Sequence, residues 1–131
     1  MILRKTLALV LLTAGQAAVA CGYCVEDKIA ATYDHAVVTR ALGLSHHIAF
    51  FHIDGPLAPG NGTRRTLEAA AESTAGVDKG SVRVSVESLT ISLAFDPQRT
   101  SLAKVHGALE RKLAAKKLTL MPLRVIDGNR I

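Results

Sequence analysis

The sequence has no tryptophan and few other aromatic residues, since three phenylalanines and two tyrosines make up 4% of its 131 residues. Apolar residues still account for 49% of the chain. We therefore expect a hydrophobic core made of valine, leucine, isoleucine and alanine side chains. A chain of this length suffices for one domain and is too short for two of ordinary size.

The motifs of several functional classes are missing as well. No acid pair, Ser/His/Asp order or zinc-hydrolase pattern occurs, and no glycine-rich phosphate loop is present. The formal net charge is +5, but no basic run is interleaved with aromatic residues as a nucleic-acid surface would need. The sequence therefore predicts neither an enzyme nor a nucleic-acid-binding protein.

Residues 1–20 have the pattern of a secretory signal peptide. Arg4 and Lys5 form a positive amino-terminal region, residues 6–20 are uncharged and mostly apolar, and Ala18-Val19-Ala20 supplies small residues for cleavage. This stretch is shorter than the roughly 20 apolar residues that a membrane-spanning helix needs. We therefore expect an exported, periplasmic protein, with an uncleaved membrane anchor as the alternative.

The spacing of apolar residues predicts an α+β domain. The expected elements are a helix over residues 25–43, a strand over 46–54, a helix over 63–74 with Thr63 as its N-cap, strands over 82–86 and 89–95, a helix over 100–116 and a strand over 118–126. The two middle strands alternate apolar and polar residues, which indicates a sheet with one buried and one polar face. Pro122 suits an edge position for the last strand.

The strand over residues 46–54 differs, because both of its faces carry apolar side chains. Ile48 and Phe50 share one face with two histidines, while Ala49, Phe51 and Ile53 point to the other. A sheet with helices on one face alone would expose Ile48 and Phe50. We therefore expect the extra N-terminal helix, or a second subunit, to cover this second face.

Residues 49–126 resemble the heavy-metal-associated domain family of metallochaperones and metal-pump modules. The resemblance is carried by Phe51-His52-Ile53-Asp54-Gly55, Leu67-Glu68, Gly76-Val77, Ala94-Phe95-Asp96-Pro97, Ser101-Leu102 and Ala108-Leu109-Glu110. It implies a ferredoxin-like βαββαβ sandwich, here with one additional N-terminal helix. The implied division is a signal peptide over 1–20, a Cys-x-x-Cys segment and helix over 21–45, the ferredoxin-fold domain over 46–126 and a tail over 127–131.

The sequence departs from that family at its metal-binding loop. The family carries Met-x-Cys-x-x-Cys directly after the first strand, whereas this chain has Pro56-Leu57-Ala58-Pro59-Gly60-Asn61-Gly62 there. No cysteine occurs in this loop, so no metal ligand of the family can be transferred to it. The resemblance supports the fold and argues against the usual metal site.

The only two cysteines are Cys21 and Cys24, in Cys-Gly-Tyr-Cys at the start of the first predicted helix. Free amide groups and the positive end of the helix dipole favour thiolates there. Two thiolates at this spacing are candidate ligands for a soft metal ion such as Cu(I), Hg(II) or Zn(II). We therefore predict a metal-binding or metal-handling accessory protein.

Other fates of the two cysteines remain open. The pair could close into a structural disulfide in an oxidising compartment, or act as a small thiol–disulfide carrier. Cleavage after Ala20 would make Cys21 the first residue, where bacterial lipoproteins are lipidated; only lipidation or an uncleaved signal would place the protein at a membrane. With a structural disulfide or a lipidated Cys21, the protein would be a non-enzymatic interaction module that binds a protein partner, or a second copy of itself, through an open sheet face. His35 is expected to face solvent, because a continuous helix would place it about 16 Å from Cys24.

Overall fold

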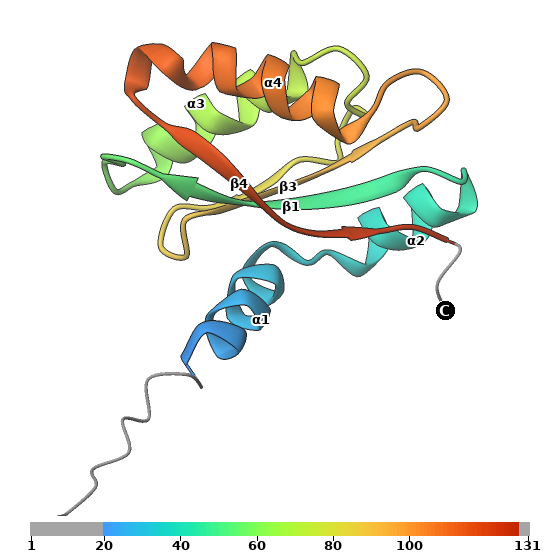
Figure 1. Cartoon of the computed structure of the whole chain (residues 1–131), viewed down its shortest axis with the longest axis horizontal. Helices are drawn as coiled ribbons and strands as arrows, with labels where there is room; N and C mark the ends of the chain where they lie inside the picture. Colours follow the sequence, from blue (N-terminus) through green and yellow to red (C-terminus); the bar gives the residue numbers. More distant parts are fainter. Residues whose placement is uncertain (1–19, 129–131) are drawn as a thin grey trace, which may run out of the picture.

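The computed structural model describes residues 20–128, and the side chains of residues 25–128. Its elements are α1 (Ala20–Thr32), α2 (His35–Gly43), β1 (His47–Asp54), α3 (Asn61–Glu72), β2 (Arg83–Ser85), β3 (Thr90–Phe95), α4 (Leu102–Leu113), a 3₁₀ turn (Ala114–Lys116) and β4 (Thr119–Ile126). Figure 1 shows one sheet lying between two layers of helices.

The sheet is antiparallel, and its strand order is β2-β3-β1-β4. Strand β1 is central, with Phe50 opposite Ser92 of β3 and Arg124 of β4. Pro122 lies in β4, so the predicted edge position of that strand is confirmed. The order of elements after α2 is βαββαβ, and the predicted α+β, ferredoxin-like fold is confirmed.

Helices α3 and α4 cover one face of the sheet (Figure 1). The largest fully buried side chains of this layer are Phe51, Ile53, Leu67, Ile91, Leu93, Phe95, Val105, Leu109 and Leu113. The expectation of a purely aliphatic core is wrong, because Phe50, Phe51 and Phe95 are all buried. The three phenylalanines are buried in the interior, whereas Tyr33 is 46% exposed.

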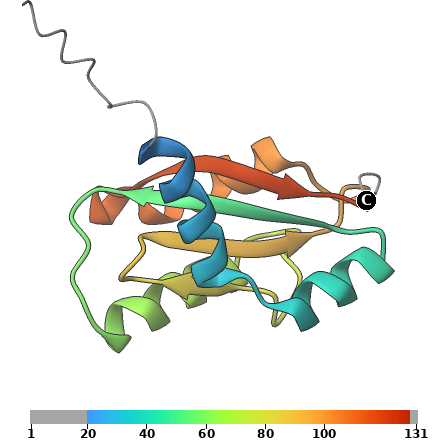
Figure 2. The ribbon, with the colours of Figure 1, turned by 90° about the horizontal axis from the view of Figure 1, so that it is seen from below.

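The opposite face is covered by α1 and α2, as Figure 2 shows from below. Ile29 of α1, together with Val38 and Ala41 of α2, packs with Ile48 and Phe50 of β1 in a second apolar cluster. Ile48 and Phe50 are each 1% exposed. The expectation that N-terminal helical structure covers this face is confirmed.

A single helix over residues 25–43 was the wrong prediction, because the chain forms two helices there. Asp34 has an extended backbone (φ −126°, ψ 113°), and its Oδ1 accepts hydrogen bonds from the backbone N–H groups of Ala36 (2.9 Å) and Val37 (3.2 Å). These contacts make Asp34 the N-cap of α2. The break lets α1 and α2 cross the sheet at different places (Figure 2).

Two further expectations are corrected. Helix α3 begins at Asn61, with Gly60 rather than Thr63 at the N-cap and without a side-chain cap. Strand β3 has no solvent-exposed polar face, because Thr90 and Ser92 are buried. The Ser92 hydroxyl donates to the carbonyl oxygen of Thr32 at 3.2 Å, so α1 takes the place of water on that face.

The structure describes only Ala20 of the predicted signal peptide over 1–20, and only residues 127–128 of the predicted tail over 127–131. Within the described part, no helix combines the length and the apolar character needed to cross a bilayer. The division of the chain into segments stays a prediction.

Candidate functional site

The two cysteines lie at the beginning of α1. This helix starts at Ala20, so the backbones of Cys21 and Cys24 belong to its first five residues. Their side chains lie outside the described residues, and their assignment as metal ligands stays a prediction.

From Val25 onward, polar contacts attach α1 to both edges of the sheet. Glu26 forms an ion pair with Arg124 of β4 through Arg124 Nη2 and Glu26 Oε1, and Arg124 Nη1 donates to Glu26 Oε2 at 3.2 Å. On the other side, the Lys28 ammonium donates to the carbonyl oxygen of Ser88 at 2.6 Å. The helix that begins with the cysteine pair is therefore held across the sheet.

The two acidic residues that anchor the N-terminal helices have lowered pKa values. Hydrogen bonding from the Arg124 guanidinium is the main cause for Glu26, and the same contact raises the pKa of Arg124. The pKa of Asp34 is lowered first by the backbone N–H of Val37 and then by Arg83, whose Nε donates to Asp34 Oδ2 at 3.0 Å. Both carboxylates therefore stay ionised at neutral pH.

The loop after β1, where the resembling family has its cysteines, is mostly exposed in this chain, but two of its residues pack against the domain. Gly55 has a φ of +124°, and a Cβ placed there would lie 2.5 Å from the carbonyl oxygen of Lys117. Leu57 packs against the main core. The loop offers no thiol, and its conformation serves packing against the segment before β4.

The histidines do not converge on one site. His35 is exposed, as expected, with its Nε2 3.5 Å from the Thr39 hydroxyl, although the continuous helix assumed for that prediction is wrong. The ring of His47 packs edge-on against Phe95, and Nδ1 of His52 is buried without a hydrogen-bond partner. Within the described part of the chain, no three His, Cys, Asp or Glu side chains form a group that could hold a metal ion.

His106 connects α4 with β4. Its Nε2 donates to Glu110 Oε1 at 2.9 Å and to the carbonyl oxygen of Leu120 at 2.8 Å, while Glu110 Oε1 also accepts the N–H of Leu120 at 3.0 Å. The His106 ring packs against Phe51. This histidine therefore has a structural role.

The sequence analysis missed a cluster at the start of β1. His46 Nδ1 donates to Asp78 Oδ2 at 2.7 Å, and its Nε2 lies 3.6 Å from Asp96 Oδ2. The three residues come from distant parts of the sequence: His46 from the start of the predicted strand over 46–54, Asp78 from the segment after Gly76-Val77, and Asp96 from Ala94-Phe95-Asp96-Pro97. No spacing rule connects them, so no sequence signal could have revealed the cluster.

No protein-family model matches this sequence, and no curated protein sequence does either. Solved structures with a similar fold include a copper-binding domain of HMA7, a P-type ATPase (16% identity, TM-score 0.49), which covers 60% of this chain and 96% of that domain. The match to oxidized MerP from Ralstonia metallidurans CH34 (20% identity, TM-score 0.48) covers 60% of this chain and 99% of MerP. The match to the CopZ metallochaperone (18% identity, TM-score 0.44) covers 56% of this chain and 98% of CopZ.

Proposed function

We propose that this protein is an exported accessory protein that binds or handles a soft metal ion through Cys21 and Cys24. The observation that carries the proposal is the Cys-x-x-Cys pair within the first five residues of a helix. Thiolates are the ligands that Cu(I) prefers, and they also bind Zn(II) and Hg(II). The role is one of binding and transfer, with the metal as cargo.

The attachment of α1 supports this role, because contacts from Glu26 onward hold the part of the helix that follows the cysteine pair against the sheet. The Glu26–Arg124 pair lies two residues after Cys24, and the buried Ile29 follows one turn later. Metal exchange between proteins needs an accessible ligand pair at a defined position. A helix held by both polar and apolar contacts provides such a position better than a free tail.

The loop after β1 supports moving the site to the N-terminus. Its sequence has no cysteine, and Gly55 packs against Lys117 too closely to leave room for a side chain there. Because the described residues hold no group of three potential metal ligands, we expect the metal to have two thiolate ligands, completed where needed by a partner or a small molecule.

Titration of the reduced chain, residues 21–131, with Cu(I) in competition with a chromophoric chelator tests the proposal. We expect one equivalent to bind, and binding to be lost in the Cys21→Ser/Cys24→Ser double variant. His35→Asn is the matched control, because it removes an exposed potential ligand from the neighbouring helix α2. Equal Cu(I) binding by the double variant and the control would refute the thiolate site.

Mass spectrometry of the exported protein tests its processing. We expect a mass that begins at Cys21, without an acyl group and with both sulfurs free after reduction. A lipid on Cys21, or retention of residues 1–20, would contradict the proposed free thiol pair.

An interaction module is the second candidate, favoured by the exposed side of β4. Met121 of this edge strand is 59% exposed. Since α1 and α2 cover Ile48 and Phe50, a partner or second copy would contact the remaining surface along β4. Sedimentation of the wild type and of Met121→Lys tests this, because an unchanged monomer in both would oppose a homodimer.

A further inference from the structure

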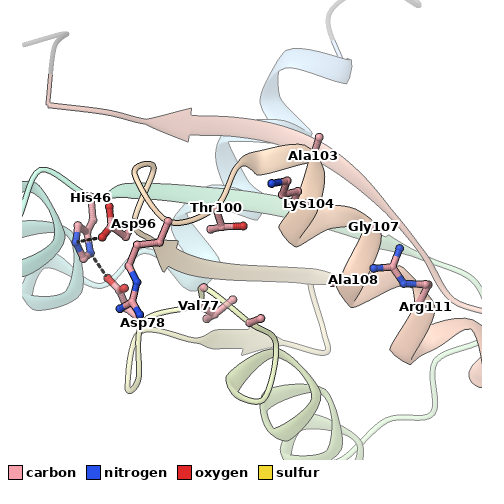
Figure 3. A pocket seen from close by; sticks show the side chains of 13 residues that line it. His46, Val77, Asp78, Asp96, Thr100, Ala103, Lys104, Gly107, Ala108 and Arg111 are labelled. Carbon is pink, nitrogen blue, oxygen red and sulfur yellow. Dashed lines mark hydrogen bonds and ion pairs between the residues drawn. The ribbon is translucent and has the colours of Figure 1, made fainter.

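A pocket beside α4 lies outside the proposed metal site. It has a volume of about 860 Å³ and is bordered by α4, by the turn around Gly76 and by the segment between β3 and α4 (Figure 3). Ligand pockets of small molecules commonly measure about 300–1,000 Å³. The size of this pocket therefore suits a small molecule.

Three cationic side chains line the pocket. Arg99 comes from the segment before α4. Lys104 and Arg111 lie two turns apart along the helix (Figure 3). All three are exposed, and none belongs to an ion pair among the described residues. Elsewhere in the described part, Arg64, Arg83 and Arg124 each pair with a carboxylate.

The acidic side chains of the pocket are already engaged. His46 lies between Asp78 and Asp96, and Figure 3 marks both contacts. Asp96 Oδ1 also accepts the backbone N–H of Gln98 at 2.9 Å. The pocket lining has three cationic side chains and two carboxylates, a net charge of +1 without any charge on His46, so the field along α4 favours an anion.

Small residues leave room beside these cations. Gly107 lies in the middle of α4, where glycine is less stable than alanine. A Cβ placed there would have one neighbour within 4 Å, Arg111 Nη1 at 3.5 Å, which is an ordinary contact. Neither packing nor backbone conformation requires glycine at this position, and the absence of a side chain there leaves the pocket open next to the Arg111 guanidinium.

We propose that this pocket binds a small oxyanion with two or more negative charges, a phosphate or a polycarboxylate. The guanidinium groups of Arg99 and Arg111 can each donate two parallel hydrogen bonds to such a group, and Lys104 adds a point charge between them along the pocket. The site is separate from the cysteine pair and does not depend on metal binding.

Titration of the chain, residues 21–131, with inorganic phosphate and with citrate, followed by amide NMR shifts, tests this proposal. Sodium chloride at matched ionic strength is the reference for screening alone. We expect saturable shifts at Gly76, Thr100 and Gly107 with at least one of the two anions. Comparison of the two titrations distinguishes a phosphate site from a polycarboxylate site.

Variants identify the responsible groups. Lys104→Met and Arg111→Gln should each weaken binding by about tenfold or more, because each removes a charged hydrogen-bond donor. Gly107→Leu keeps every cation but fills the space, and should also abolish the saturable shifts. Arg65→Gln is the matched control, since it removes an exposed cation on α3 outside the pocket.

Two outcomes would overturn the proposal. One is the absence of saturable shifts with either anion, or shifts that chloride reproduces at equal ionic strength. The other is an equal loss of affinity in Arg65→Gln and Arg111→Gln, which would indicate general attraction to a basic surface. The exposed side chains of Lys104 and Arg111 can be replaced without disturbing the core, so each variant gives a decisive result.

Discussion

Removal of residues 21–45 should unfold the domain, because α1 and α2 form one side of its core. The deletion removes the buried side chains of Ile29 and Val38, each 7% exposed, and uncovers Ile48 and Phe50, each 1% exposed, so the burial of four side chains is lost. Burying a side chain of this size stabilises a protein by about 1.5–3 kcal/mol, so their sum is about 6–12 kcal/mol. The total stability of a small domain is about 5–15 kcal/mol, and the loss is therefore comparable with the whole.

Urea denaturation of residues 21–131 and 46–131, followed by far-UV circular dichroism, provides the measurement. We expect a cooperative transition for the longer chain, and a shorter chain that is unfolded or aggregated without urea. A milder variant, Ile29→Ala, should cost about 2–4 kcal/mol. Asp27→Ala is its control, because Asp27 is exposed on the same helix.

Limited proteolysis tests the same reasoning in the intact chain. If α1 and α2 are part of the core, the segment 21–43 should resist cleavage as well as the rest of the domain does. Rapid removal of this segment, leaving a folded remainder with an unchanged urea midpoint, would refute the packing account.

Two further predictions concern α4 and the turn around Gly76. Glu110→Gln should destabilise the domain by about 1 kcal/mol at neutral pH, because the Glu110 carboxylate accepts the N–H of Leu120. That hydrogen bond is the main cause that lowers the pKa of Glu110 below its usual 4.5. The stability difference between wild type and Glu110→Gln should therefore persist above pH 4.5 and vanish as the pH falls through the lowered pKa. A constant difference in thermal denaturation from pH 7 to pH 2 would contradict this. Gly107→Ala should raise stability by up to about 1 kcal/mol, whereas Gly76→Ala should lower it, because φ is +87° and the new Cβ would lie 2.5 Å from Thr100; equal melting temperatures for the two variants would show the local geometry to be irrelevant.

Much of the fold could be predicted from local sequence patterns. The helical spacing of Leu102, Val105, Leu109 and Leu113 predicts one apolar side of the helix over 100–116, and in α4 the last three are buried while Leu102 is partly buried. The apolar residues on both faces of β1 indicated that its second face needed cover from the N-terminal helix or from a second subunit. These inferences succeeded because each depends on residues close together in the sequence.

Predictions failed where tertiary contacts prevailed over local pattern. Thr90 and Ser92 alternate with apolar residues as an exposed face would, yet α1 covers them and the carbonyl oxygen of Thr32 accepts the Ser92 hydroxyl. The break at Asp34 was missed because apolar spacing continues across it, although an aspartate is also a favourable N-cap. No pattern predicts which polar residues a neighbouring helix will bury.

The candidate site divides in the same way. The Cys21–Cys24 pair and its position at a helix start can be recognised from sequence, because the chemistry depends on two residues three positions apart. The His46–Asp78–Asp96 cluster and the three cations beside Gly107 cannot, since the loops that bring them together are positioned by the sheet.

The amino-acid sequence by itself determined the order of strands and helices, the need for cover on both faces of β1 and the location of the only thiols. Tertiary structure decided that two N-terminal helices, rather than one, supply this cover, and that basic residues of α4 border a pocket. The physical reason is range: backbone preference and apolar periodicity act over a few residues, whereas burial and ion pairing depend on segments that meet when the chain folds.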